Sequence, residues 1–103
     1  MRVTVVRSGG IAGMVTTTTV DAADLDGPGA DGLRSAVAGC SFRERSGPVA
    51  PAMRDGFSYE VTLVADGGAS QQVRFVQGTA PEGMDTLLRW VDDCPAGHRE
   101  TGR

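Results

Sequence analysis

The sequence has no lysine and a single histidine, so two residue types common in binding and catalytic sites are almost missing. All 10 positive charges come from arginine, against 13 acidic residues, and the net charge is −3. Nucleic-acid binding needs a basic face that displaces counterions from the phosphate backbone. The arginines form no such cluster, and this disfavours a nucleic-acid partner.

Catalytic chemistry has little support in the sequence. His98 lies in the C-terminal segment, which argues against a Ser-His-Asp triad and against a histidine-based metal site. Asp85, Asp92 and Asp93 lie on the polar side of a predicted helix, and the last two oppose its dipole, as solvent-exposed residues do. We therefore expect no catalytic residue, no metal ligand and no enzymatic activity.

The sequence has 2 cysteines, Cys40 and Cys94, too few for a zinc site by themselves. They can form one disulfide, or they can be buried free thiols in a reducing compartment. No stretch is long and apolar enough to span a membrane, and Arg7 interrupts the N-terminus before a signal-like apolar region develops. We expect a cytoplasmic protein with reduced thiols and no membrane partner, or else one already processed.

The length of 103 residues and the hydrophobic content of 40% indicate one domain with a real core. We place this domain in residues 1–95 and expect residues 96–103 to be a disordered tail. A connection from Ser41 to Gly56 shows no periodicity and contains two prolines, Pro48 and Pro51. A connection of this length in so small a domain is either functional or mobile.

Four strands are predicted. Residues 2–6 and 14–20 form the first two, the second being a β-branched run of high strand propensity. The third is the clearest, with apolar side chains alternating with polar ones at Phe57, Tyr59, Val61 and Leu63. A turn at Asp66-Gly67-Gly68 leads to a return strand over residues 71–77, where Arg74 can pair with Glu60 across the outer face.

Two helices complete the prediction. The first covers residues 30–39, with Leu33 on its apolar side. The second begins with a capping box, Thr79-x-x-Glu82, and ends before Pro95. Its apolar stripe is Met84, Leu87, Leu88 and Val91. The predicted fold is α+β, a single antiparallel sheet of about four strands with two helices packed on one face.

The segment Arg7-Ser8-Gly9-Gly10-Ile11-Ala12-Gly13 is unusual, because three glycines surround one large apolar residue. Glycine allows positive φ and close approach of another backbone. Two interpretations follow. Ile11 either folds back over the sheet edge, or it projects from a narrow loop into the cleft of a partner.

Three motifs together resemble the emfourin family, small protein inhibitors of thermolysin-like zinc metallopeptidases of the protealysin type. They are the glycine-rich segment Arg7 to Gly13, then Asp55-x-Phe57-x-Tyr59-Glu60, then Val73-Arg74-Phe75. The resemblance covers about residues 2–91. The connection over residues 41–54, the glycine-rich first helix and the tail depart from the family pattern, and this leaves contacts specific to those regions in doubt.

The resemblance implies an α+β fold, inhibition of a metallopeptidase from the same cell, and no cofactor. Thermolysin-like enzymes favour a bulky apolar residue just after the scissile bond, which Ile11 matches. The implied target-binding residues are Arg7, Ser8, Gly9, Gly10, Ile11, Ala12, Gly13, Asp55, Phe57 and Tyr59. We expect a monomer when free. The alternative is a non-catalytic adaptor that recruits a peptide by strand addition at a sheet edge.

Overall fold

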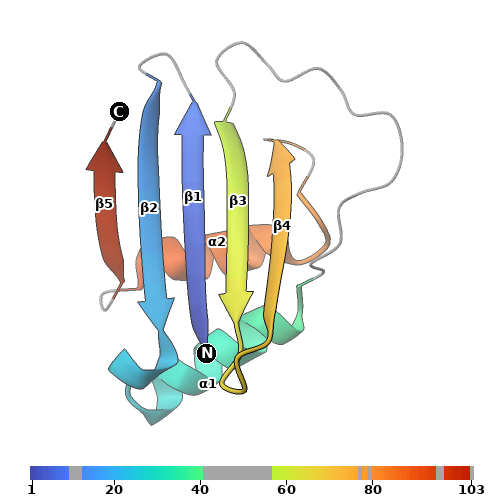
Figure 1. The fold of residues 1–103 in the computed structure, drawn as a ribbon. Coiled ribbons are helices and arrows are strands. Elements are labelled where there is room, and N and C mark those ends of the chain that lie inside the picture. The colour runs from blue at the N-terminus through green and yellow to red at the C-terminus, as the bar shows by residue number, and fades with distance from the viewer. Residues whose placement is uncertain (10–12, 41–56, 77, 79, 95–96, 103) are drawn as a thin grey trace.

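The computed structural model describes residues 1–9, 13–40, 57–76, 78, 80–94 and 97–102. The described strands are β1 (Arg2–Gly9), β2 (Met14–Asp21), β3 (Phe57–Val64), β4 (Ser70–Val76) and β5 (His98–Gly102). The α-helices are α1 (Gly27–Ala38) and α2 (Met84–Asp93), and a short 3₁₀ helix, η1, covers Ala22–Asp24. Figure 1 shows these elements in one sheet with the helices behind it.

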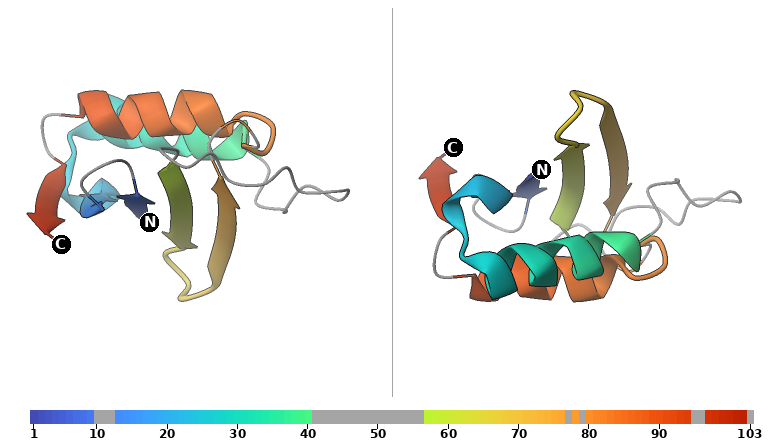
Figure 2. Two further views of the ribbon diagram at one scale, coloured as in Figure 1. Left: turned by 90° about the horizontal axis from the view of Figure 1, so that it is seen from above. Right: turned by 90° about the horizontal axis from the view of Figure 1, so that it is seen from below.

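The sheet is antiparallel throughout, with strand order β4-β3-β1-β2-β5, so that β1 is the central strand. Figure 2 shows both helices on the same side of the sheet. The predicted α+β fold with one antiparallel sheet is therefore confirmed, except that the sheet has five strands instead of about four. We call the side towards the helices the inner face.

The extra strand, β5, corrects the prediction of a disordered tail for residues 98–102. Its five residues are all exposed, so no apolar alternation marked it as a strand. It forms because the edge of β2 offers unpaired backbone groups, with Arg99 directly opposite Thr18. Arg99 also donates to a carboxylate oxygen of Asp92 at 3.3 Å, which ties β5 to the end of α2.

The hairpin of β3 and β4 agrees with the sequence pattern. The turn is closed by a hydrogen bond from the Ala65 amide to the Ala69 carbonyl at 2.8 Å. Across the outer face, the guanidinium of Arg74 donates to the Glu60 carboxylate at 3.1 Å. The predicted pair is thus confirmed, and because both side chains are solvent-accessible it contributes at most about 1 kcal/mol.

Helix α1 begins at Gly27, earlier than the predicted residue 30. The reason is a cap that the apolar periodicity does not reveal. The side chain of Asp26 accepts a hydrogen bond from the Gly29 amide at 2.7 Å, and Pro28 lies in the first turn. At the other end Gly39 is the C-cap, as expected.

Helix α2 begins at Met84, so the capping box predicted from Glu82 does not start this helix, and Thr79 lies outside the described residues. The N-cap is Gly83, with φ 78° and no side-chain cap. A Cβ atom at Gly83 would lie 1.9 Å from the Gly39 carbonyl oxygen. The positive φ and the close approach to the end of α1 therefore both require glycine at the N-cap of α2.

Cys40 links the end of α1 to the start of α2. Its thiol donates to the carbonyl oxygens of Ala36 and Gly83, each at 3.1 Å. Burial raises the pKa of the Cys40 thiol, which keeps it protonated and poorly reactive. Cys40 and Cys94 are both free in this structure, and the reduced state in the cell stays a prediction.

The core lies between the helices and part of the inner face. Side chains of residues directly opposite each other on paired strands point to the same face. The inner side chains therefore form rows that run across the sheet from strand to strand. The rows under the helices supply most of the buried sheet residues: Val3, Val5, Val20, Val61, Leu63 and Val73. Leu33 of α1 and Met84, Leu87 and Val91 of α2 cover them. Within the described residues, neither helix is long and apolar enough to cross a membrane.

Candidate contact surface at the loop end of the sheet

The two segments predicted to bind a target meet at one end of the sheet. Gly9, the last residue of β1, pairs with Met14 of β2 on one side and with Phe57 of β3 on the other. Arg7 likewise pairs with Tyr59. We call this the loop end of the sheet, because β1 ends there and β2 and β3 begin there (Figure 1). The structure thus brings together two motifs that lie far apart in the sequence.

Glycine is required at both described ends of the β1–β2 connection. Gly9 has φ 109° and Gly13 has φ 61°, a region that L-residues with side chains rarely adopt. The expected use of glycine for positive φ is confirmed at these two positions. Gly10, Ile11 and Ala12 lie outside the described residues, and so does Asp55, so the two interpretations of Ile11 both stay predictions.

Arg7 and three aromatic residues form a continuous platform on the inner face. The guanidinium carbon of Arg7 lies 5.0 Å from the centre of the Phe57 ring, a cation–π contact worth about 0.5–1 kcal/mol. Tyr59 stacks on Phe75 of β4, with ring centres 5.1 Å apart and planes at 14°. All four side chains are half-buried, so they combine a fixed arrangement with an accessible surface.

Ser8 is the remaining predicted target-binding residue that the structure describes. Ser8 lies between Arg7 and Gly9 and pairs with Ser58, on the opposite face of the sheet from the platform. A partner that reaches the loop end can therefore contact Gly9 and Gly13 together with either Ser8 or the platform. Within the described parts of the chain, no three acidic, cysteine or histidine residues lie where they could hold a metal ion.

Sequence reasoning missed two residues of this surface, Met14 and Phe75. Met14 is 40% exposed, a high value for a large apolar side chain, and it sits directly opposite Gly9. Phe75 belongs to the motif Val73-Arg74-Phe75 but was not among the predicted target-binding residues; it is half-buried and stacks on Tyr59. The sequence feature that could have identified Met14 is its position directly after Gly13, where it begins the second strand of the hairpin.

Comparison with known protein families places the fold and the loop end in a wider context. A family model described as Emfourin matches residues 5–92. The matched range runs from β1 into α2 and includes both connections that reach the loop end, whereas β5 lies beyond it. No curated protein and no solved structure matches the chain.

Proposed function

The chain belongs to the emfourin family, and from this membership we propose that it inhibits a thermolysin-like zinc metallopeptidase of the protealysin type. Family membership is consistent with protease inhibition, and an inhibitor needs no catalytic residue or cofactor of its own. The observation that carries the proposal is the pairing of Gly9 with both Met14 and Phe57, which unites the family motifs on one surface.

The glycine-rich connection between β1 and β2 is the element that enters the active-site cleft. Its anchor, β1, is the central strand and is hydrogen-bonded to β2 on one side and to β3 on the other, so the connection starts from a strand that is paired along both edges. An inhibitory loop held in one conformation loses little conformational entropy on binding, which favours affinity. Ile11 supplies the apolar side chain that such an enzyme accepts after the scissile bond.

The platform beside the loop provides a second contact. Arginine and aromatic residues are enriched among the residues that dominate binding energy at protein interfaces. Arg7, Phe57 and Tyr59 are half-buried next to Gly9, and Met14 adds exposed apolar surface. A partner that buries this region would gain both apolar area and a charged donor. The free protein is then a monomer whose binding surface becomes covered only in the complex.

The alternative, an adaptor that binds a peptide by strand addition, finds less support. The two edge strands of the sheet are β4 and β5. β4 carries Arg74 and two glutamines, and β5 carries Arg99 and Glu100. Charged and polar edge strands are the usual means of preventing strand addition. The loop end, in contrast, combines apolar and aromatic residues.

The test is a titration of a protealysin-type peptidase and of thermolysin with the protein, measuring hydrolysis of a peptide substrate. We expect stoichiometric loss of activity for a sensitive enzyme, and a small inhibitor that occupies the active-site zinc should compete with binding of the protein. Ile11→Asp should weaken inhibition at least about a hundredfold. Burying one isoleucine contributes roughly 1.5–3 kcal/mol, removing a central anchor of an interface can cost more, and each 1.4 kcal/mol is tenfold.

The matched control is Ala69→Asp, which adds the same charge to the exposed turn between β3 and β4 at the opposite end of the sheet. It should inhibit like the wild type. Thermal unfolding separates the two interpretations of Ile11. If Ile11 enters the cleft, Ile11→Asp loses inhibition with an unchanged melting temperature, and if Ile11 covers the sheet edge, stability falls as well. Full inhibition by a fully stable Ile11→Asp variant would contradict the proposed role of this loop.

A further inference from the structure

Arg7 occupies a position where the sheet pattern calls for an apolar residue. It follows Val3 and Val5 on the inner face of the central strand, and these two side chains are 0% and 8% exposed. A charged side chain at such a position costs free energy unless it is paired or hydrogen-bonded. Places where a local rule is broken in this way are often functional sites.

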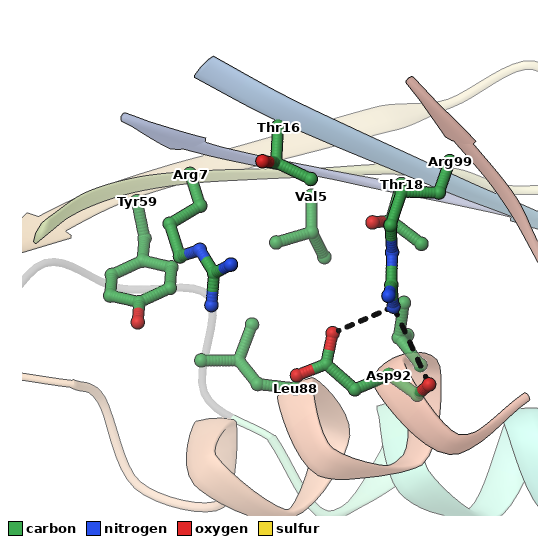
Figure 3. Close-up of a pocket in the computed structure, with 9 residues that line it drawn as sticks. Val5, Arg7, Thr16, Thr18, Tyr59, Leu88, Asp92 and Arg99 are labelled. Carbon is green, nitrogen blue, oxygen red and sulfur yellow. Dashed lines mark hydrogen bonds and ion pairs between the residues drawn. The ribbon is translucent and has the colours of Figure 1, made fainter. Parts of the chain in front are cut away.

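Arg7 lines a cavity of about 330 Å³ between the inner face and α2. Figure 3 shows the guanidinium of Arg7 and the carboxylate of Asp92 pointing into this cavity, with Thr16 and Thr18 above and Leu88 below. The lining residues come from five elements: Val5, Arg7, Thr16, Thr18, Tyr59, Leu88, Val91, Asp92 and Arg99. This volume is within the range of small-ligand sites, about 300–1,000 Å³.

The charges in the cavity do not balance. Asp92 is already paired with Arg99, which donates to its carboxylate at 3.3 Å and to its main-chain carbonyl at 3.4 Å. Among the described residues, Arg7 forms no ion pair, and its guanidinium lies over the ring of Phe57. Two arginines and one aspartate leave a net positive charge, in a protein whose overall charge is −3. One carboxylate would neutralise it.

We propose that this cavity binds a carboxylate that carries a short apolar chain. The guanidinium of Arg7 can donate two parallel hydrogen bonds to a carboxylate, the strongest neutralising geometry available to a side chain. Thr16 and Tyr59 also line the cavity, and their hydroxyl groups can act as further donors. The side chains of Val5, Leu88 and Val91 form an apolar wall for the rest of the ligand.

Such a carboxylate has two sources with the same chemistry, a free organic acid and the C-terminal carboxylate of a peptide. Binding does not depend on the proposed inhibitory function, because the cavity belongs to the free protein and is formed by β1, β2, β3, α2 and β5. The experiment below uses no peptidase, so its failure leaves the inhibitory proposal untouched.

The experiment is a titration of ¹⁵N-labelled protein followed by amide chemical shifts. The first pair of probes is 4-methylpentanoate and its neutral amide, 4-methylpentanamide. The second pair is N-acetyl-glycyl-leucine and its C-terminal amide. We expect saturable shifts for Arg7, Thr16, Tyr59 and Leu88 with at least one acid, and binding at least tenfold weaker for its amide. Whichever acid binds more tightly identifies the source.

Arg7→Gln should weaken binding of the acid at least tenfold, because it removes the charge but keeps a polar side chain. The matched control is Arg2→Gln on the same strand, whose guanidinium pairs with Asp21 away from the cavity and whose loss should change affinity less than twofold. If Arg7→Gln does not fold, Thr16→Val removes one donor at nearly constant volume and should weaken binding about threefold or more.

Three results would overturn the proposal. They are the absence of saturable shifts with both acids, equal affinity for an acid and its amide, and unchanged affinity in a folded Arg7→Gln protein. Saturable shifts that map to Arg2 and Asp21 instead of the cavity would also overturn it, since they would identify a different carboxylate-binding surface.

Discussion

The inner face of the sheet has two halves that differ in what covers them. In the half under the helices, β1 presents Val3 and Val5, which are almost completely buried. In the half at the loop end, the same strand presents Arg7, and its neighbours across the sheet are Thr16 and Tyr59. One strand therefore serves two regions, of which the first stabilises the fold and the second keeps polar and aromatic side chains accessible.

The difference shows how a small domain can hold a binding surface in place. Buried apolar area supplies most of the folding free energy, about 25 cal/mol per Å², and here it is concentrated under α1 and α2. The loop end contributes less, so substitutions there are free to serve binding. Because both halves share β1, the contact surface is attached directly to the strand that carries the buried core residues Val3 and Val5.

The largest effect is expected when an arginine is placed in the half of the inner face that lies under the helices. Val3→Arg puts a charge at a position that is 0% exposed, and none of the buried residues in the described part of the chain carries a carboxylate that could pair with it. We expect a loss of more than about 4 kcal/mol, enough to prevent folding of a marginally stable domain. Circular dichroism and urea unfolding measure it. A folded Val3→Arg protein with stability close to wild type would contradict the assignment of the core.

The second prediction compares two neighbouring leucines of α2. Leu87 is 0% exposed, whereas Leu88 is half-buried and lines the cavity near Arg7. Leu87→Ala should therefore cost about 3 kcal/mol, and Leu88→Ala about 1 kcal/mol, since less apolar area is lost. Urea unfolding of the two variants gives the difference directly. Equal losses would mean that the helix is rotated relative to the structure.

The third prediction concerns β5. Deletion of residues 97–103 removes an exposed edge strand and the Arg99–Asp92 ion pair. We expect a stability loss of about 1 kcal/mol, because surface ion pairs and exposed strands contribute little. Inhibition should be unchanged, since the family match ends at residue 92. Carboxylate binding should disappear, because Asp92 then neutralises Arg7. An abrupt loss of inhibition would instead show that β5 contacts the target.

The smallest effect is expected for Arg7→Val. This change continues the series of inner-face valines, Val3 and Val5, into the half of the sheet at the loop end. The cation–π contact with Phe57 is lost, at about 0.5–1 kcal/mol, while valine adds strand propensity and removes a half-buried charge. The free energy of unfolding should stay within about 0.5 kcal/mol of wild type. A large destabilisation would assign Arg7 a structural role in place of a binding role.

The sequence predicted what depends on local periodicity. The alternation of Phe57, Tyr59, Val61 and Leu63 located β3, and the spacing of Met84, Leu87 and Val91 located α2. It could not place the start of α2, because Gly83 is fixed by contact with Gly39. It also missed β5, whose exposed residues carry no pattern.

Part of the candidate site could be predicted, and part could not. The glycine-rich segment and the Phe57–Tyr59 motif were both identified, since each has an unusual composition. Their contact through Gly9 and Phe57 depends on the register between β1 and β3, which are separated by β2, α1 and a long connection. Nor did any pattern reveal that Arg7 faces a cavity formed with α2, since this depends on where the helix crosses the sheet.

The central position of β1 also affects synthesis of the chain. β1 leaves the ribosome before the other described strands, and β2 can pair with one of its edges at once, but its other edge must wait for β3. Until then the nascent hairpin presents an open strand edge and the apolar side chains of Val3, Val5 and Val20. Unpaired edges of this kind promote association between chains. Since α1 is made before β3, its Leu33 is available to shield the hairpin during this interval.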